Sequence, residues 1–249
     1  MSTSPRLPLL ILDGLVREVK IANCYILQHK DDAPEMRPEQ FDISHWQQRP
    51  GYEVISSGRG GSVRIELDGR AAILRRYHRG GVVGKFLNDQ YLWMGKTLSR
   101  PWREWKILQR AQGAGLPVPE PIAASICRSG LCYRASLITA FLNETETLTH
   151  RLQQTALKPG YWHAIGILIK RMHVAGIRHA DLTSDNILID SQDQFYLIDF
   201  DMARVMNHID DWQWRPLYRL QRSIEKRDRN RKLYFEEDNW QELMDGYQS

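Results

Sequence analysis

Segment 179–201 constrains this chain more than any other, because polar clusters there enclose two short apolar runs. The polar segment 179–186 reads HADLTSDN, and apolar runs follow at 187–190 and 195–198 with a polar break between them. Two apolar runs joined by a short polar break predict a β-hairpin. Three polar side chains would meet at one edge of this hairpin, those of Asp181, Asn186 and Asp199.

Two carboxylates and an amide at one edge are the set that phosphoryl transfer from ATP requires. Asp181 could orient an acceptor hydroxyl group and accept its proton, while Asn186 and Asp199 could hold Mg²⁺ on the nucleotide phosphates. The competing interpretation is a chance cluster of Asp and Asn in solvated turns, where both are common. The two apolar strands at the right places favour the catalytic interpretation.

A glycine-rich turn at 57–62 (SGRGGS) lies between two predicted strands. Because no side chain intervenes, Gly58, Gly60 and Gly61 would let backbone N–H groups approach nucleotide phosphates. Glycine-rich hairpins are common, so this turn indicates a nucleotide cover only in combination with segment 179–201.

The resemblance of segment 179–201 to protein kinases implies that the strand predicted at 71–77 carries a cation that reaches the phosphates, as the strand lysine does in kinases. This strand offers two adjacent arginines. Side chains alternate across a strand, so only one of Arg75 and Arg76 can face the cleft. We expect Arg75, because it shares its face with the small and apolar residues that would support the adenine ring. Lys85 is the alternative.

A helix is predicted to begin after Ser99, with a proline in its first turn, and to end at Gly113. In protein kinases, which segment 179–201 resembles, a helix glutamate pairs with the strand cation. This resemblance implies that Glu104 pairs with the arginine of the preceding strand and assists catalysis in this way. The alternative is an ordinary exposed glutamate in a first helical turn, which the helix dipole favours.

An apolar strand is predicted at 135–142. By the resemblance of segment 179–201 to protein kinases, this strand should end between two lobes, where backbone groups from Thr139 to Phe141 would meet the edge of the adenine. The next helix, predicted from Gly160 to Gly176, leads to His179. We expect His179 to pack and to orient the loop, since Asp181 already supplies the group that faces the acceptor.

The chain of 249 residues has a net charge of +4, which fits an acidic ligand or an anionic membrane surface and does not require nucleic acid. Part of this charge lies on a predicted basic helix that could bind substrate phosphates or an anionic bilayer. Its cations are Arg215, Arg219, Arg222 and Lys226. No apolar run approaches the roughly 20 residues of a membrane span, so we expect a cytosolic protein.

Three cysteines, Cys24, Cys127 and Cys132, form neither a C-x-x-C pair nor a ligand pattern with histidine. We therefore expect reduced thiols and no structural zinc site.

The segments 179–186 (HADLTSDN) and 199–201 (DFD) resemble the catalytic loop H-R-D-L-x-x-x-N and the D-F-G turn of protein kinases. This resemblance implies an α+β, bilobal, protein-kinase-like fold. Residues 1–142 would form an N-terminal lobe with a small antiparallel sheet and one main helix, and residues 143–249 a larger, mostly helical lobe. The chain departs from the protein-kinase pattern at Ala180, Thr183 and Asp201. These departures favour small-molecule or lipid-linked substrates over proteins.

Three more motifs, HRGGVVGK at 78–85, RPWREW at 100–105 and GLPVPEP at 115–121, resemble those of the bacterial 3-deoxy-D-manno-octulosonic acid (Kdo) kinases. That family belongs with the sugar kinases of the lipopolysaccharide core. The resemblance implies ATP-dependent phosphorylation of the 4-hydroxyl group of a Kdo residue on a Kdo–lipid A precursor. It also implies peripheral contact with the cytoplasmic face of the bacterial inner membrane.

Three alternatives remain at this point. A heptose kinase or an aminoglycoside-type kinase would share every catalytic residue named above. A non-catalytic ATP-binding scaffold is conceivable because arginine replaces the strand lysine of protein kinases. Nucleic-acid binding through the C-terminal arginines would require salt-dependent retention of RNA or DNA.

Overall fold

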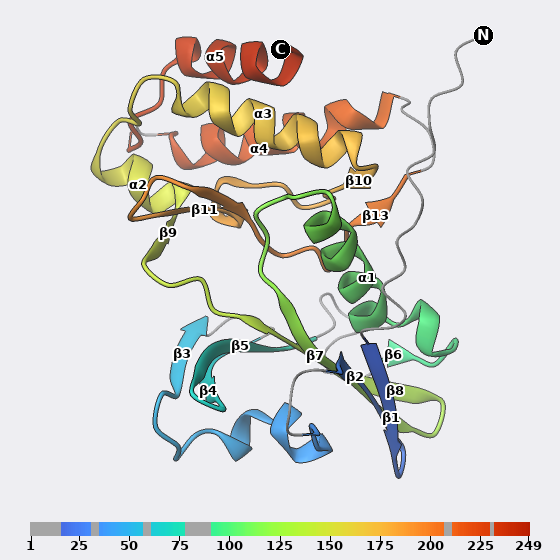
Figure 1. Ribbon diagram of the computed structural model, residues 1–249. Helices are drawn as coiled ribbons and strands as arrows, with labels where there is room; N and C mark the ends of the chain where they lie inside the picture. The colour runs from blue at the N-terminus through green and yellow to red at the C-terminus, as the bar shows by residue number, and fades with distance from the viewer. Residues whose placement is uncertain (1–15, 31–34, 57–60, 78–90, 207–210, 230–231) are drawn as a thin grey trace, which may run out of the picture.

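The computed structural model describes residues 16–30, 35–56, 61–77, 91–206, 211–229 and 232–249. The protein has mixed α/β structure, and every strand pair in the described ranges is antiparallel. Figure 1 shows a β-sheet built mainly from the first half of the chain and a mostly helical region built from the second half.

An eight-stranded sheet dominates the first half. Seven strands follow the order β1-β2-β7-β8-β5-β4-β3, and β6 pairs with β8. Because β7 and β8 follow helix α1 in the sequence but occupy the centre of the sheet, they join strands that are distant along the chain. The strands are β1 (Val16–Ile21), β2 (Cys24–His29), β3 (Glu53–Ser56), β4 (Ser62–Leu67), β5 (Arg70–Arg76), β6 (Tyr91–Leu92), β7 (Pro121–Ser129) and β8 (Cys132–Ala140).

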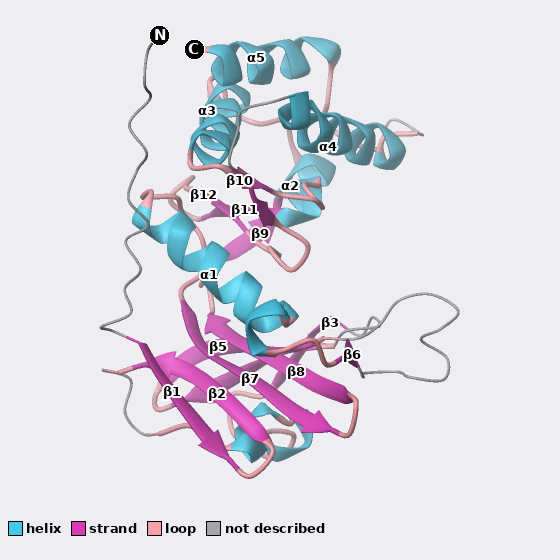
Figure 2. Ribbon diagram, turned by 90° about the vertical axis from the view of Figure 1, so that its right-hand side faces the viewer, coloured by secondary structure: helices cyan, strands magenta, loops and turns pink. Residues whose placement is uncertain are grey.

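The two faces of this sheet are covered by different elements. Helix α1 (Arg100–Gly113) crosses one face, as Figure 2 shows. Two 3₁₀ helices, Pro38–Phe41 and Ile43–His45, contribute to the cover of the other. The neighbouring residues Leu137 and Ile138 of β8 are both buried, the first in the cluster that includes α1 and the second in the opposite cluster. Alternation along one strand therefore fills two cores.

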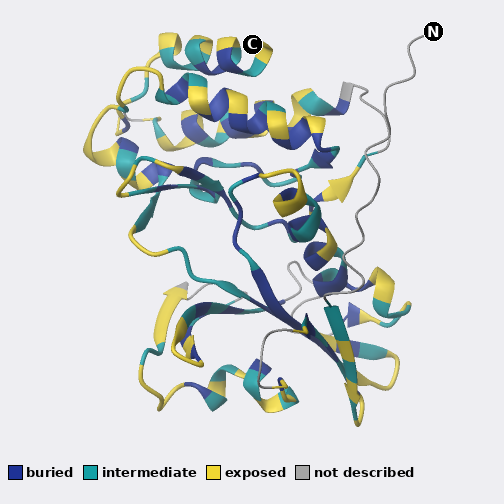
Figure 3. Cartoon of the chain, viewed as in Figure 1, coloured by how far each residue is buried: buried dark blue, intermediate teal, exposed yellow. Residues whose placement is uncertain are grey.

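The second half of the chain contains four helices and two small sheets within the described residues. Helices α3 and α4 turn their buried residues inward and their exposed residues outward (Figure 3). The helices are α2 (Leu148–Gln154), α3 (Tyr161–Val174), α4 (Trp214–Arg227) and α5 (Glu237–Gln248). The small sheets are formed by β9 (Thr145–Thr147), β11 (Ile187–Asp190) and β12 (Phe195–Leu197), and by β10 (Ile177–Arg178) with β13 (Arg204–Val205). Among the described residues, no helix combines the length and the apolar character that crossing a bilayer requires.

Two glycines allow α3 and α5 to pack unusually close. A Cβ atom built on Gly166 of α3 would lie 2.0 Å from the carbonyl oxygen of Leu243, and one on Gly246 of α5 would lie 2.1 Å from that of His163. Backbone atoms of one helix thus occupy the space that a side chain on the other would need. Both positions require glycine for this packing.

The structure corrects the expectation of three reduced cysteines. Cys24 of β2 lies opposite Cys127 of β7, and their sulfur atoms are joined in a disulfide, while Cys132 is free. The two bonded residues are 103 positions apart, so only the register of β2 against β7 brings them together. The sequence shows no sign of this register.

Candidate active site

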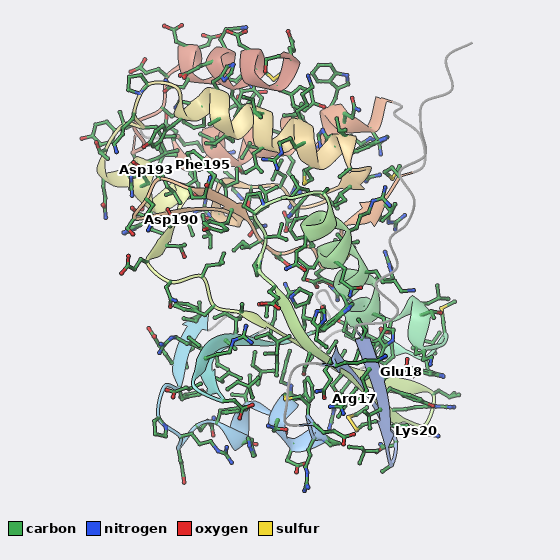
Figure 4. The ribbon with its side chains drawn as sticks, viewed as in Figure 1. Arg17, Glu18, Lys20, Asp190, Asp193 and Phe195 are labelled. Carbon is green, nitrogen blue, oxygen red and sulfur yellow. A yellow bond between two sulfur atoms is a disulfide. The ribbon has the colours of Figure 1, made fainter. Side chains whose placement is uncertain are left out.

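The hairpin predicted from the apolar runs is present as β11 and β12, which pair antiparallel. Asp190 closes its turn, because its Oδ1 accepts the N–H groups of Gln192 and Gln194 at 2.9 and 2.8 Å. Figure 4 labels Asp190 and Asp193 at this end, together with the buried Phe195. A short polar turn therefore fixes the register that carries the two strands to the opposite, open end.

The open end brings the predicted polar residues into one unit. The N–H group of Ile198 donates to the carbonyl oxygen of Asn186 at 3.1 Å, which places Asn186 beside the chain that leads to Asp199. The side-chain amide of Asn186 donates to the carbonyl oxygen of Asp181 at 2.8 Å. Asp199 has a φ of +64°, a left-handed conformation that non-glycine residues adopt rarely and that aspartate tolerates better than most.

His179 connects the loop to the acidic turn from within the core. It is fully buried, its Nε2 donates to the carbonyl oxygen of Ile198 at 2.9 Å, and its Nδ1 accepts the N–H group of Asp181 at 3.3 Å. Its ring packs on Phe200 with the centroids 4.8 Å apart. Burial lowers the pKa of His179 below its usual value, and the ring is therefore neutral near pH 7. The structure places His179 as a packing and orienting residue, as expected.

The pairing expected between the strand arginine and the helix glutamate is present. Arg75 forms ion pairs with Glu104 of α1 and with Asp199, so one guanidinium joins a strand, a helix and the acidic turn. Tyr77 donates its hydroxyl proton to Glu104 at 2.5 Å. Burial alone would lower the pKa of Arg75, but the nearby negative charges, that of Glu104 first, raise it above its usual value. Arg75 therefore carries a permanent charge at this point.

Alternation along β5 separates the two arginines as predicted. Arg76 turns away from the cluster, and its Nη1 lies 3.8 Å from Asp42. Three other predicted residues, Gly58, Gly60 and Lys85, fall outside the described residues. Gly61 is described, and it directly precedes β4 next to the cavity-lining Ser62.

A cavity of about 750 Å³ opens beside this cluster. Apolar side chains form much of its wall, and Thr139 and Phe141, which stay a prediction for the adenine, are among its lining residues. The N–H groups of Ala140 and Phe141 already donate to the carbonyl oxygens of Glu120 and Ala71, at 2.8 and 3.1 Å. A base bound here would therefore use other backbone groups of this segment. The polar residues around the cavity include Arg75, Glu104, Asn186 and Asp199.

The donor set at the cavity suits a magnesium ion shared with a phosphate ligand. No group of three or more His, Cys, Asp or Glu side chains that could hold a metal occurs in the part of the chain that the structure describes. Asn186 and Asp199 offer one amide oxygen and one carboxylate, and Mg²⁺ is commonly bound by one or two carboxylates together with water and substrate phosphates. Because the amide nitrogen of Asn186 is engaged by Asp181, its oxygen is the atom left for a cation.

Asp181 is not among the residues that line the cavity, and its carboxylate pairs with an arginine of α4. Three residues of α4, spaced four apart and so on one face, contact the loop 181–185. Arg219 pairs with Asp181, the hydroxyl group of Ser223 accepts the N–H group of Ser184 at 3.1 Å, and Arg227 pairs with Asp185. These contacts pack α4 against the loop that contains Asp181.

Several contacts at the site were not predicted from the sequence. Tyr77 could have been found, because it lies two positions after Arg75 and thus on the same face of the strand. Arg219 gave no local signal, since 38 positions separate it from Asp181. The same holds for Arg100, which pairs with Asp201 across 101 positions and ties α1 to the acidic turn.

Comparison with known proteins identifies one family and several similar proteins. The family described as "Lipopolysaccharide kinase (Kdo/WaaP) family" matches residues 44–247. A 3-deoxy-D-manno-octulosonic acid kinase of Vibrio parahaemolyticus is 38% identical over 205 residues, which cover 82% of this chain and 86% of the relative. Proteins of the same name from Photobacterium profundum and Haemophilus influenzae (strain PittEE) are 36% and 35% identical, and they cover 84% and 90% of this chain and 88% and 96% of their own length.

Proposed function

This chain belongs to the lipopolysaccharide kinase (Kdo/WaaP) family, and we propose that it transfers the γ-phosphoryl group of ATP to the 4-hydroxyl group of a Kdo residue on a Kdo–lipid A precursor. The observation that carries this proposal is the ion pairing of Arg75 with both Glu104 and Asp199 at the wall of a cavity that Asn186 also lines. A permanent cation beside a carboxylate and an amide is suited to bind a nucleoside triphosphate together with its metal ion.

In this proposal ATP occupies the cavity. The adenine lies against the segment from Thr139 to Phe141, and the triphosphate extends towards Arg75 beneath the turn that contains Gly58, Gly60 and Gly61. Residues 1–142 act as the lobe that covers the nucleotide and residues 143–249 as the lobe that carries the catalytic loop, the bilobal layout of protein kinases. The sheet with α1 on one side of the cavity and the hairpin on the other supports this division.

The positions of the side chains support the catalytic roles proposed here. Asn186 and Asp199 would hold Mg²⁺, which when bound neutralises charge on the phosphates. Asp181 orients the sugar hydroxyl group and accepts its proton late in an in-line transfer. Arg75, kept in place by Glu104, offsets the negative charge that develops on the transferred group.

The acceptor is attached to lipid, so we place the reaction at the cytoplasmic face of the inner membrane, with the protein in peripheral contact. The net charge of +4 favours an anionic surface of this kind.

Mass spectrometry of the lipid product tests the proposal. Incubation with ATP, Mg²⁺ and the Kdo–lipid A precursor should add one phosphate group, and fragmentation should locate it on O4 of Kdo. A heptosylated acceptor and an aminoglycoside serve as parallel substrates. Phosphorylation of either of these in preference to the precursor would contradict the acceptor assignment, and no phosphorylated product with any acceptor would contradict the kinase assignment.

A further inference from the structure

Arg219 occupies a position that the reaction as described above does not explain. Its Nε donates to Oδ1 of Asp181 at 2.6 Å, and its Nη2 also contacts that oxygen. The side chains of Arg219 and Asp181 are 52% and 43% exposed. An exposed ion pair of this kind adds little to stability, so a structural role alone is a weak explanation for an arginine placed on the catalytic carboxylate.

The ion pair engages only some of the hydrogen-bonding atoms of Arg219 and Asp181. Both arginine nitrogens address the same oxygen, and within the described residues Oδ2 of Asp181 and Nη1 of Arg219 have no other partner. A guanidinium has five N–H donors in a planar fork. The edge formed by Nη1 and Nη2 is therefore available for a second anion, while Oδ2 is available for a hydroxyl group.

The position also identifies which substrate can reach this edge. Asn186 and Asp199 line the nucleotide cavity, whereas neither Asp181 nor Arg219 does. Arg219 instead contacts the carboxylate that meets the acceptor hydroxyl group in the proposed function, and it is therefore placed to contact the acceptor. The acceptor named for the relatives is a sugar acid, and a carboxylate is the partner that a planar guanidinium binds best, through two parallel hydrogen bonds.

We propose that Arg219 binds the carboxylate of the acceptor sugar acid and thereby selects an acidic sugar, with its guanidinium lying between that carboxylate and Asp181. This inference rests on the proposed function. Two carboxylates brought close to each other repel, and the arginine between them offsets the repulsion. The same contact sets the distance from the bound sugar to Asp181, so Arg219 determines both specificity and placement of the hydroxyl group.

The test combines one variant with one chemically altered acceptor. Steady-state kinetics are measured for the wild-type protein and Arg219→Gln with the Kdo–lipid A precursor and with the same precursor whose Kdo carboxyl group is converted to a methyl ester. For the wild type, the ester should lower kcat/KM for the acceptor about 10- to 100-fold, the range expected for losing a charged hydrogen-bonded pair. Arg219→Gln should lose a similar factor with the acid but little more with the ester, while KM for ATP stays unchanged.

Arg227→Gln is the matched control, because Arg227 lies on the same helix and forms a similarly exposed ion pair with Asp185, which has no role in the proposed reaction. It should leave both acceptors unaffected. Equal losses with acid and ester in Arg219→Gln would overturn the inference, since they would mean that Arg219 acts on Asp181 alone. An unchanged kcat/KM for the acid in Arg219→Gln would also overturn the inference. In either case turnover by the wild type would still support the proposed function, whereas no turnover by the wild type would overturn both.

Discussion

Two arginine–aspartate pairs at the open end of the hairpin differ in what else the arginine contacts. Arg75, which is 21% exposed, joins Asp199, 37% exposed, to Glu104, whose side chain is only 3% exposed. Arg219 pairs with Asp181, with about half of each side chain in solvent. The buried cluster of Arg75, Glu104 and Tyr77 is held in place before any ligand binds, because its members contact one another. The exposed pair leaves a donor edge and an acceptor oxygen for a substrate.

The comparison predicts the largest effect at Asp181. Replacing it, Asp181→Ala, should lower the rate of transfer on the order of 1,000-fold, since it removes the group that accepts the hydroxyl proton. Binding of ATP, measured by calorimetry, should stay close to that of the wild type, because Asp181 does not line the cavity. Asp185→Ala is the control, because Asp185 also pairs with an arginine of α4. Normal turnover of Asp181→Ala would refute its role.

Unlike Asp181→Ala, substitutions in the buried cluster should lower both the stability of the protein and its affinity for ATP. Glu104→Gln should lower the free energy of unfolding by about 3 kcal/mol, because removing one partner of a buried ion pair leaves the others without compensation. Glu120→Gln, in the exposed pair with Arg70 at 3.3 Å, should cost less than about 1 kcal/mol. Chemical denaturation measures both, and similar losses in the two variants would remove the distinction between buried and exposed pairs.

His173 is buried and has no ion pair among the described residues, so it shows how burial changes the pKa of a side chain. Burial lowers the pKa of His173 to about 4, from an ordinary value of 6.5. Between these values the unfolded chain binds a proton that the folded protein does not, so stability is full above pH 6.5 and falls as the pH drops towards 4.

Because of this difference in pKa between the folded and unfolded states, protonation of His173 should lower the free energy of unfolding by about 2 kcal/mol between pH 7 and pH 5. His173→Gln should remove this part of the pH dependence, and the exposed His150→Gln should leave it in place. Denaturation curves at both pH values provide the measurement. The same slope in wild type and His173→Gln would contradict the assignment.

Much of the site could be predicted because its parts are local. The apolar runs around Asp190 predicted the hairpin, and the period of two along β5 selected Arg75 over Arg76. The helix that contains Glu104 was delimited by the proline in its first turn and by Gly113. In each case the signal depends on spacing within a few residues, which backbone geometry converts directly into a face or an edge.

Segment 21–27 (IANCYIL), whose residues predict a single strand, shows where such reasoning fails. The chain instead turns at Ala22 and Asn23, with a φ of +52° at Ala22, and forms β1 and β2. Two strands form because β1 pairs with β2 and β2 pairs with β7. Segment 21–27 does not encode this pairing.

The sequence by itself determined the chemistry of this protein: which residues carry carboxylates, amides and cations, and which of them lie together on one strand, helix or hairpin. The tertiary structure alone decided the long-range contacts, namely the disulfide of Cys24 with Cys127, the glycine contact of α3 with α5 at Gly166, and the placement of Arg219 on Asp181. The physical reason is that the backbone fixes direction over a few residues, whereas contacts across tens of residues depend on the packing of the whole core.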